Sequence, residues 1–528
     1  MAEKRNDTAE VIAPSSTESQ LGTVQELSND ALQLAALGHK EELERNFGLL
    51  ALAGLGFVCS GSWSGVAQSL VAAILSGGPS VLVYGALIIP SMIIFVVLSL
   101  AEIASAYPTT AGPLEWTYRL APRKHAAFLS WMTGWSNMLS WIVGASANVA
   151  VMTFQIVFLA NLFHPSYESK SWHVFLIMEA LLILNCLMNV FGTRILPLVD
   201  TAGFWWFLAS FFVVGITAVA AANPHQPAKF VFATFINQTG WDNSFVVFMN
   251  GLIITAGNFV ALDSISHLSE EMPNPSRTVP RAMIMTITIG ALTDFIVCIL
   301  LMFSVGQDIE EFFNSGAPYL TIMLTSTGSK AAVACISTMQ LVNNFNSTTS
   351  VIQVGSRIIW AFARDGGFIF PKYFSKVNKS LACPVPAVIM SWAIAALISV
   401  LYLASTTAFN ALMSCLVILG YFAYGVPILC LLLRGRVLDR EGTFKLGKAG
   451  WTINILALCF MSFLTIFFCF PVYLPATKNN MNYASLVSVG LMLIAYLLWI
   501  FVGKKNFKGP SLAGIVVADD AVAQEKDV

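Results

Sequence analysis

The sequence predicts an all-α integral membrane protein with twelve transmembrane helices. The first observation is composition: 56% of the residues are hydrophobic and 11% are charged, which is about half the charge expected of a soluble protein. The second is that apolar stretches of about 20 residues, long enough to cross a bilayer, recur along nearly the whole chain. The third is that basic residues are concentrated in alternate loops, as in multi-pass membrane proteins.

The predicted spans follow one another closely, and the third and eighth are long enough to tilt in the bilayer. Residues 1–45 form a polar tail that is predicted to be mostly disordered. A transmembrane domain is expected over 46–505 and a second tail over 506–528. No cleavable signal peptide is recognisable. The predicted span limits are 47–75, 80–106, 126–162, 172–192, 198–222, 243–268, 282–305, 330–362, 385–404, 407–434, 450–470 and 483–503.

The distribution of lysine and arginine predicts the orientation. With the N-terminus in the cytoplasm, the outer face holds only Lys170, Lys229, Lys330 and Lys478 of the 28 basic residues. This asymmetry follows the positive-inside rule, so both termini are expected in the cytoplasm. The sequon Asn237-Gln238-Thr239 would then lie outside, where it is either glycosylated or left unmodified.

Two of the predicted spans contain helix-breaking residues. Between Gly54 and Gly65, the first span has four glycines and three serines in twelve residues, which weakens a helix. The sixth span contains the polar pair Gly257-Asn258 and then the acid Asp263. Each span is either broken at these residues or continuous. A continuous first span would use its small residues for close helix packing, and a continuous sixth span would have a simple kink.

The positions of these two spans favour a transport site. They open two successive groups of five helices, which is the pattern of an inverted repeat with a solute site near the bilayer midplane. The predicted repeats cover about 47–222 and 243–434, and two extra helices cover about 450–503.

Unwinding at these two places creates complementary polar groups. The first would expose backbone N–H groups for a carboxylate, and the second would free carbonyl groups for an ammonium. A zwitterion would use both kinds of group, whereas a quaternary amine such as choline needs aromatic faces. Phe57, Trp63 and Phe259 are the candidates for these faces. The alternative is that their rings face lipid or pack in the protein core. The candidate solute-binding residues are Ser60, Gly61, Ser62, Trp63, Thr255, Gly257, Asn258, Phe259, Asn343 and Asn344.

Asn343 and Asn344 are included because amides in the eighth span cannot all face lipid, although bonding between helices is an alternative explanation. Asp263 is the candidate proton-coupling residue, since acids within spans are usually functional. Its alternative role is a local hydrogen bond or an arginine pair. The predicted inner gate, or else ordinary solvated loop charge, consists of Glu102, Glu270, Glu271, Arg277, Arg281, Arg364 and Asp365.

Three separated motifs carry a family resemblance. They are Glu102-Ile-Ala-Ser-Ala-Tyr107-Pro108, Asn258–Asp263 with Glu270–Arg281, and Arg357–Gly367. In this order they resemble the amino acid–polyamine–organocation superfamily over about 45–505. The strings Gly61-Ser62-Trp63 and Lys229–Phe235 are similar to those of fungal permeases for choline, GABA and amino acids.

This resemblance implies a LeuT-type fold and secondary active transport, usually coupled to protons. It implies import of choline, a related quaternary amine, GABA or an amino acid, most often across the plasma membrane. The alternatives are an exchanger, a vacuolar GABA permease and a non-transporting nutrient sensor. The chain departs from the family at Ser60-Gly61-Ser62-Trp63 and at Gly257, where relatives often carry an aromatic gate. Both departures leave the substrate open.

Other classes of protein are disfavoured by the sequence. The nine cysteines form no C-x-x-C or Cys/His cluster, so neither a metal nor another cofactor is expected. No nucleophile elbow or phosphate loop indicates an enzyme, and no repeated pore loop indicates a channel. The net charge of −1 argues against a nucleic-acid partner. The expected partners are a small solute, a proton and the lipid bilayer; the oligomeric state stays open.

Overall fold

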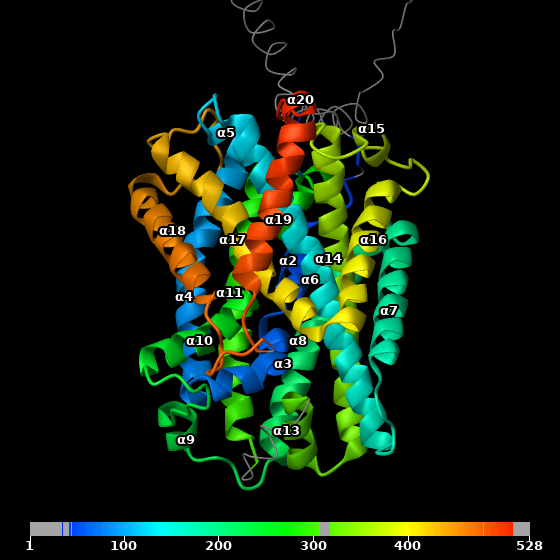
Figure 1. The fold of residues 1–528 in the computed structure, drawn as a ribbon, viewed down its shortest axis with the longest axis vertical. Coiled ribbons are helices and arrows are strands. Elements are labelled where there is room, and N and C mark those ends of the chain that lie inside the picture. The colour runs from blue at the N-terminus through cyan, green and yellow to red at the C-terminus, as the bar shows by residue number, and fades with distance from the viewer. Residues whose placement is uncertain (1–33, 35–41, 44, 307–316, 479, 511–528) are drawn as a thin grey trace, which may run out of the picture. The chain divides into compact units, whose positions relative to one another are not determined.

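A computed structural model describes residues 34, 42–43, 45–306, 317–478 and 480–510. The predicted tails therefore lie almost wholly outside the described residues. The part from Leu43 to Pro510 is one compact unit, and the described residues in it contain helices but no β-strand (Figure 1). The first half holds α2 (Leu49–Cys59), α3 (Ser62–Leu75), α4 (Gly78–Ala106), α5 (Pro113–Leu120), α6 (Ala126–Phe163), α7 (Ser171–Phe191), α8 (Leu196–Ala221) and α9 (Ala228–Ala233).

The second half begins with the other interrupted span and ends in the helices nearest the C-terminus. It holds α10 (Ser244–Gly257), the 3-10 helix η1 (Ser264–Glu271), α11 (Pro275–Phe303), α13 (Pro318–Thr327), α14 (Lys330–Arg364), α15 (Pro371–Phe374), α16 (Val385–Ala404), α17 (Thr406–Leu433), η2 (Gly447–Ala449), α18 (Gly450–Phe467), α19 (Ala484–Leu498), the π-helical turn η3 (Trp499–Gly503) and α20 (Lys504–Asn506).

Nine helices in the described part of the chain are long and apolar enough to cross a membrane. Two shorter apolar helical stretches, 49–65 and 244–257, coincide with the interrupted spans. One boundary differs from the prediction: α11 begins at Pro275 rather than near 282. Proline at the first helical turn costs no hydrogen bond, and Asn274 adopts the left-handed conformation just before it, so the expected loop after Asn274 is helical.

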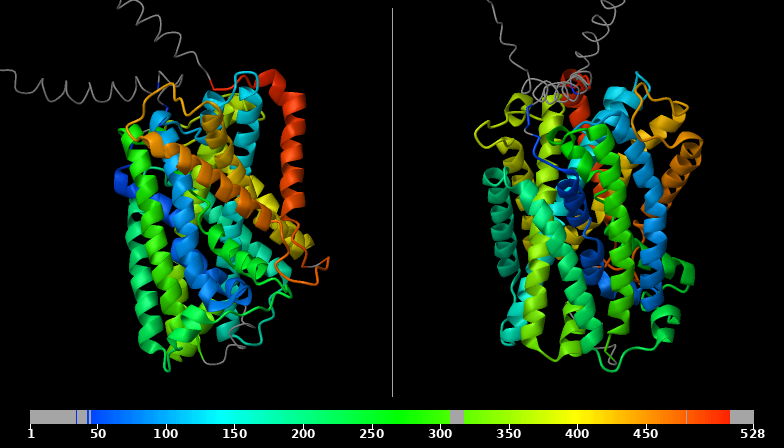
Figure 2. Two further views of the ribbon diagram at one scale, coloured as in Figure 1. Left: turned by 90° about the vertical axis from the view of Figure 1, so that its left-hand side faces the viewer. Right: turned by 180° about the vertical axis from the view of Figure 1, so that it is seen from behind.

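Long helices surround the broken ones. α4 packs along α11, and α6 packs along α14 and α17. Figure 2 shows α4 and α11 running side by side at one edge of the bundle, and α7 at the opposite edge against α16. α18 and α19 both contact α17, and the left view of Figure 2 shows α19, in red, at the edge of the bundle. The broken helices are thereby held in the interior.

Candidate functional site

The first helix break is created by backbone geometry that glycine allows. α2 ends at Cys59 and α3 begins at Ser62. Gly61 between them has a φ of 66°, a conformation that costs other residues free energy. The Ser60 hydroxyl donates to the Phe57 carbonyl at 2.9 Å, and the Ser60 and Ser62 hydroxyl oxygens are 2.8 Å apart. The hydroxyls therefore satisfy part of the backbone that the break frees.

The second break lies directly against the first. α10 ends at Gly257, and the chain continues through a turn into η1. A Cβ atom on Gly65 would be 2.4 Å from the Asn258 side-chain oxygen. Glycine at 65 is thus what allows α3 and the α10 break to approach so closely.

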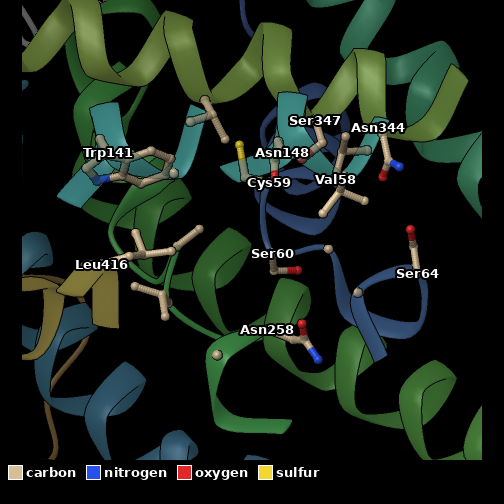
Figure 3. A pocket seen from close by; sticks show the side chains of 18 of the residues that line it. Val58, Cys59, Ser60, Ser64, Trp141, Asn148, Asn258, Asn344, Ser347 and Leu416 are labelled. Atoms are coloured by element: carbon tan, nitrogen blue, oxygen red, sulfur yellow. Dashed lines mark hydrogen bonds between the residues drawn. The ribbon is translucent and has the colours of Figure 1, made fainter. Parts of the chain in front are cut away.

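A cavity of about 270 Å³ lies beside the two breaks, far larger than the roughly 10–15 Å³ that a single water needs. In Figure 3 the side chains of the breaks, Ser60, Ser64 and Asn258, lie on one side, and those of α6 and α14 lie opposite. Among the residues that the structure describes, none that lines the cavity is charged. The lining residues are Val58, Cys59, Ser60, Gly61, Ser64, Gly65, Ser140, Trp141, Gly144, Asn148, Val151, Phe207, Gly257, Asn258, Val260, Ala261, Asn344, Ser347, Val351, Leu416 and Tyr424.

Half of the candidate solute-binding residues line this cavity. They are Ser60, Gly61, Gly257, Asn258 and Asn344. The structure places the other five in the surrounding core. Thr255 is buried close to Gly85 of α4, and Ser62 and Phe259 both lie close to Gly290 of α11. Asn343 accepts from Ser210 of α8 at 3.4 Å.

The aromatic candidates also pack away from the cavity. Trp63 is fully buried in edge contacts with Phe207 and Phe211, at centroid distances of 5.3 and 6.2 Å. Phe57 packs on Phe204 and Phe207. The reason is that α2 and α3 turn these two rings toward α8, which supplies a phenylalanine cluster.

The aromatic side chains that line the cavity are Trp141, Phe207 and Tyr424, on three other helices, and sequence reasoning missed them. The sequence carries a signal for Trp141, which lies in the third span. Small and polar residues recur in the third span at Asn137, Ser140, Gly144 and Asn148, spaced by three or four residues as one helix face requires.

Asp263 lies fully buried outside the cavity lining, yet it contacts two residues that form the lining. Tyr424 donates its hydroxyl hydrogen to Oδ1 at 2.7 Å, and the Trp141 indole N–H donates to the same oxygen at 3.3 Å. The amide of Asn137 donates to Oδ2 at 2.9 Å. Local hydrogen bonding, the alternative considered for this acid, is present. The contacts also connect it to the cavity wall.

His267 is a further partner of Asp263 that the sequence analysis passed over. Its Nε2 lies 2.7 Å from Oδ2 of Asp263, and both side chains are fully buried. Its Nδ1 lies 2.7 Å from the Thr110 carbonyl oxygen, which only accepts, so Nδ1 carries a hydrogen. The contact between Nε2 and Oδ2 is an ion pair whenever the imidazole is protonated. The signal for this contact in the sequence was the four-residue spacing between Asp263 and His267.

Two buried ion pairs lie at the same end of the molecule as η1. Arg357 binds both carboxylate oxygens of Glu271, with N–O distances of 2.8 and 3.2 Å. Arg364 binds both oxygens of Glu270 at 2.9 and 3.1 Å. Both acids are only 4% exposed, so neither is a solvated loop charge. Arg357 was not among the predicted gate residues.

The remaining gate candidates divide into two groups. Glu102 pairs with Arg436 at 2.6 Å and accepts from the Leu446 backbone N–H at 2.8 Å. Asp365 lies 4.0 Å from the Nε of its neighbour Arg364. The Arg277 and Arg281 side chains, by contrast, are exposed on the first turns of α11 and form no ion pair within the described part of the chain.

No group of three or more His, Cys, Asp or Glu residues within the described ranges is arranged to hold a metal ion.

Comparisons with known proteins agree on one family. The family model described as "Amino acid permease" matches residues 47–494. A choline transporter of Saccharomyces cerevisiae is 36% identical over 90% of this chain and 85% of its own length. A putative amino acid/polyamine transporter of Macrophomina phaseolina is 31% identical over 82% of this chain and 97% of its own. A swainsonine transporter of Arthroderma benhamiae is 32% identical, with coverage of 90% and 95%.

Proposed function

The chain belongs to the amino acid permease family and is a membrane transporter rather than an enzyme, and from this premise we propose that it imports choline or a related small amine by alternating access. The observation that carries the proposal is the central cavity. It combines three aromatic side chains, from Trp141, Phe207 and Tyr424, with no charged residue among the described residues of its lining. Aromatic faces bind a quaternary ammonium by cation–π attraction, and they require no hydrogen-bond donor from the solute.

A zwitterionic amino acid or GABA is the second candidate substrate. α3 begins beside the cavity at Ser62, and its first N–H groups point out of the helix end. Such an end favours a carboxylate. The similarity to a relative named as an amino acid/polyamine transporter adds support.

The proposed architecture is the LeuT-type arrangement of twelve spans. The nine long apolar helices are joined in this count by α14 and by the two interrupted spans, α2–α3 and α10–η1. The repeats are about 47–222 and 243–434, followed by α18 and α19. Supporting this, the two interruptions contact each other directly through Gly65 and Asn258 at the edge of the cavity.

Proton coupling is proposed to use the Asp263–His267 pair. In the present conformation the pair needs one shared proton, since Nδ1 already donates to Thr110. Losing that proton would set a lone pair against a carboxylate within the first turn of η1. The repulsion would strain this turn and loosen its hydrogen bonds to Thr110 and to Asn137 of α6. Tyr424 and Trp141 would transmit this movement to the bound solute. A proton crossing 100 mV supplies about 2.3 kcal/mol for accumulation.

The buried pairs Glu271–Arg357 and Glu270–Arg364 are proposed to be the inner gate, together with Glu102–Arg436. This end of the bundle would face the cytoplasm, in agreement with the positive-inside pattern. The plasma membrane is the proposed location, with both tails cytoplasmic.

The test is an uptake panel of choline, ethanolamine, GABA and amino acids in a host that lacks its own permeases. Purified protein in proteoliposomes with an imposed proton gradient provides the direct measurement. We expect accumulation of choline above the external concentration, abolished by a protonophore. A chain that binds solute but never concentrates it would be a sensor. Accumulation that ignores both pH and protonophore would rule out proton coupling.

A further inference from the structure

We propose that the inner end of the bundle carries a binding site for the headgroup of an anionic phospholipid. The site is a basic patch of exposed side chains, and none of them forms an ion pair within the described part of the chain. Clusters of roughly four to eight lysines and arginines directly cytoplasmic of a span attract anionic lipids. The inference rests on the proposed orientation, in which this end faces the cytoplasm, and it lies apart from the solute site. The basic patch consists of Arg123, Lys124, Lys504, Lys505 and Lys508.

Two segments that are far apart in the sequence supply this basic patch. Tyr118 of α5 donates its hydroxyl hydrogen to the Lys508 carbonyl at 2.9 Å. Phe128, near the start of α6, makes an edge contact with Trp499 of η3 at a centroid distance of 5.7 Å. The turn between α5 and α6 is thus held against the turn that follows α19, and α5 and α20 are drawn at the same end of the bundle (Figure 1). The basic side chains of both turns therefore share one surface.

A buried ring fixes the backbone that carries the three lysines. Phe507 is only 2% exposed, although Lys505 and Lys508 on either side of it are exposed. Its ring centroid lies 5.7 Å from that of Trp131 in α6 and 5.7 Å from that of Phe362 in α14. Because the backbone is already held in place, a ligand needs to order only the lysine side chains, which lowers the entropy cost of binding.

The protein itself supplies little negative charge to this basic patch. The sequence has no Asp or Glu in residues 116–167 or in residues 442–518. Glu115, in the first turn of α5, is buried in an ion pair with Arg119. Like charges gathered on one surface repel one another, and an anionic ligand relieves that repulsion. Charge complementarity therefore favours an anion.

An exposed apolar strip leads along α19 to the basic patch. Among the nine long apolar helices of the described chain, the one over 484–506 has the smallest buried share of its apolar window, 17%. Its exposed apolar side chains recur at the spacing of one helix face, and Lys504 follows one turn after the last of them. These side chains are Leu493, Ile494, Leu497, Ile500 and Phe501.

The apolar strip identifies the anion as a lipid headgroup rather than a free phosphate. A phospholipid places its acyl chains along the strip and its phosphate beside Lys504 and Lys505, so that both parts of the surface are used. A free phosphate uses only the basic patch. A bound lipid would also join the turn after α19 to α5, and through Phe507 to α6 and α14. Since binding to the folded state alone stabilises it, such a lipid should raise the melting temperature.

The test measures saturable binding of radiolabelled short-chain phosphatidylserine to the purified full-length chain in detergent, together with the melting temperature. One triple variant combines Lys504→Gln, Lys505→Gln and Lys508→Gln. The matched control combines Lys372→Gln, Lys376→Gln and Lys379→Gln, which removes the same charge from exposed lysines elsewhere.

We expect the wild type and the control to bind the lipid and to be stabilised by it. The first triple variant should bind at least about tenfold more weakly, since each lysine near an anionic lipid contributes roughly fivefold. Phosphatidylcholine, which has no net charge, should not compete.

Three results would overturn the proposal. The first is the absence of saturable phosphatidylserine binding to the wild type. The second is equal binding by the two triple variants, which would indicate general attraction to a basic surface. The third is displacement of the lipid by inorganic phosphate at equal concentration, which would indicate a site for a free anion. None of these results touches the proposed transport function, because the binding assay contains no amine solute. A chain that binds the lipid and transports no amine would overturn the proposed function alone.

Discussion

The imidazole of His267 and the carboxylate of Asp263 approach to 2.7 Å, and neither side chain reaches solvent. The Thr110 carbonyl holds the far side of the imidazole. Asn137, Trp141 and Tyr424 donate to the carboxylate. A chargeable pair is thereby built into the wall behind the central cavity.

Replacing Asp263 with asparagine tests the acid directly. Asp263→Asn should lower concentrative uptake of choline at least about tenfold, because an amide cannot bind and release a proton as a carboxylate does. The Kd for choline should change by less than about threefold. Radiotracer uptake and equilibrium binding on the same preparation measure the two. Asp294→Asn is the matched control, since Asp294 is also fully buried but its carboxylate forms no hydrogen bond to a residue of the cavity lining. Equal loss of binding and uptake would mean a structural role.

His267→Gln should uncouple transport from pH. Glutamine keeps a hydrogen-bond donor toward Asp263 but does not titrate between pH 5 and 8, as histidine does. Downhill choline flux should persist, whereas the dependence of uptake on external pH should disappear. His225→Gln, at an exposed position, should retain the wild-type pH profile. A wild-type profile in His267→Gln would exclude this histidine from coupling.

Phe207→Leu should weaken binding of choline more than binding of GABA. Phe207 lines the cavity, and losing one cation–π contact of about 0.5–2 kcal/mol raises Kd by roughly two- to thirtyfold. Competition binding with both solutes gives the ratio. Phe211 lies in the same aromatic cluster but outside the cavity lining. The control variant Phe211→Leu should therefore leave that ratio unchanged. If GABA binding falls more than choline binding, the amino-acid substrate is favoured.

Gly65→Ala should damage the site by separating the helix breaks. The added methyl group would be 2.4 Å from the Asn258 side-chain oxygen, so one of the two breaks must shift. Choline binding should fall at least about tenfold, since misplacement by about 1 Å is costly in preorganised sites. Gly490→Ala, which meets no atom within 4 Å, should bind normally. Unchanged binding in Gly65→Ala would show that the contact is dispensable.

Removing Arg357 should destabilise the protein. Arg357→Gln leaves Glu271 buried without its bidentate partner, a loss of about 3–5 kcal/mol. Thermal unfolding followed by size-exclusion chromatography should show a clearly lower melting temperature. Lys445→Gln, which breaks an exposed pair with Glu441, should leave the melting temperature almost unchanged. Similar melting temperatures for the two variants would contradict a gate held by buried charge.

Much of the fold could be predicted because its signals are local. A run of apolar residues is long enough to cross a bilayer wherever it occurs, and glycines such as Gly61 weaken a helix regardless of their neighbours. The two interruptions therefore appear in the structure at the expected residues, Gly61 and Gly257. The start of α11 was misplaced because proline was read as ending a helix, whereas Pro275 begins one.

The site was harder to predict, because spans are apolar on every side and hydropathy says little about which way a residue points. Trp63 and Phe207 are equally apolar in sequence, yet only Phe207 faces the cavity. His267 looked like part of a polar loop, whereas η1 folds back and buries it.

From local chemistry alone, the chain specifies a membrane protein with two broken helices and an intramembrane acid. The partners of that acid come from α6, α17 and η1, and the cavity's aromatic faces come from α6, α8 and α17. These segments lie far apart along the chain. Their side chains meet only because helix packing sets the rotation of each helix, and a distance of 2.7 Å between Asp263 and His267 has no counterpart in hydropathy or composition.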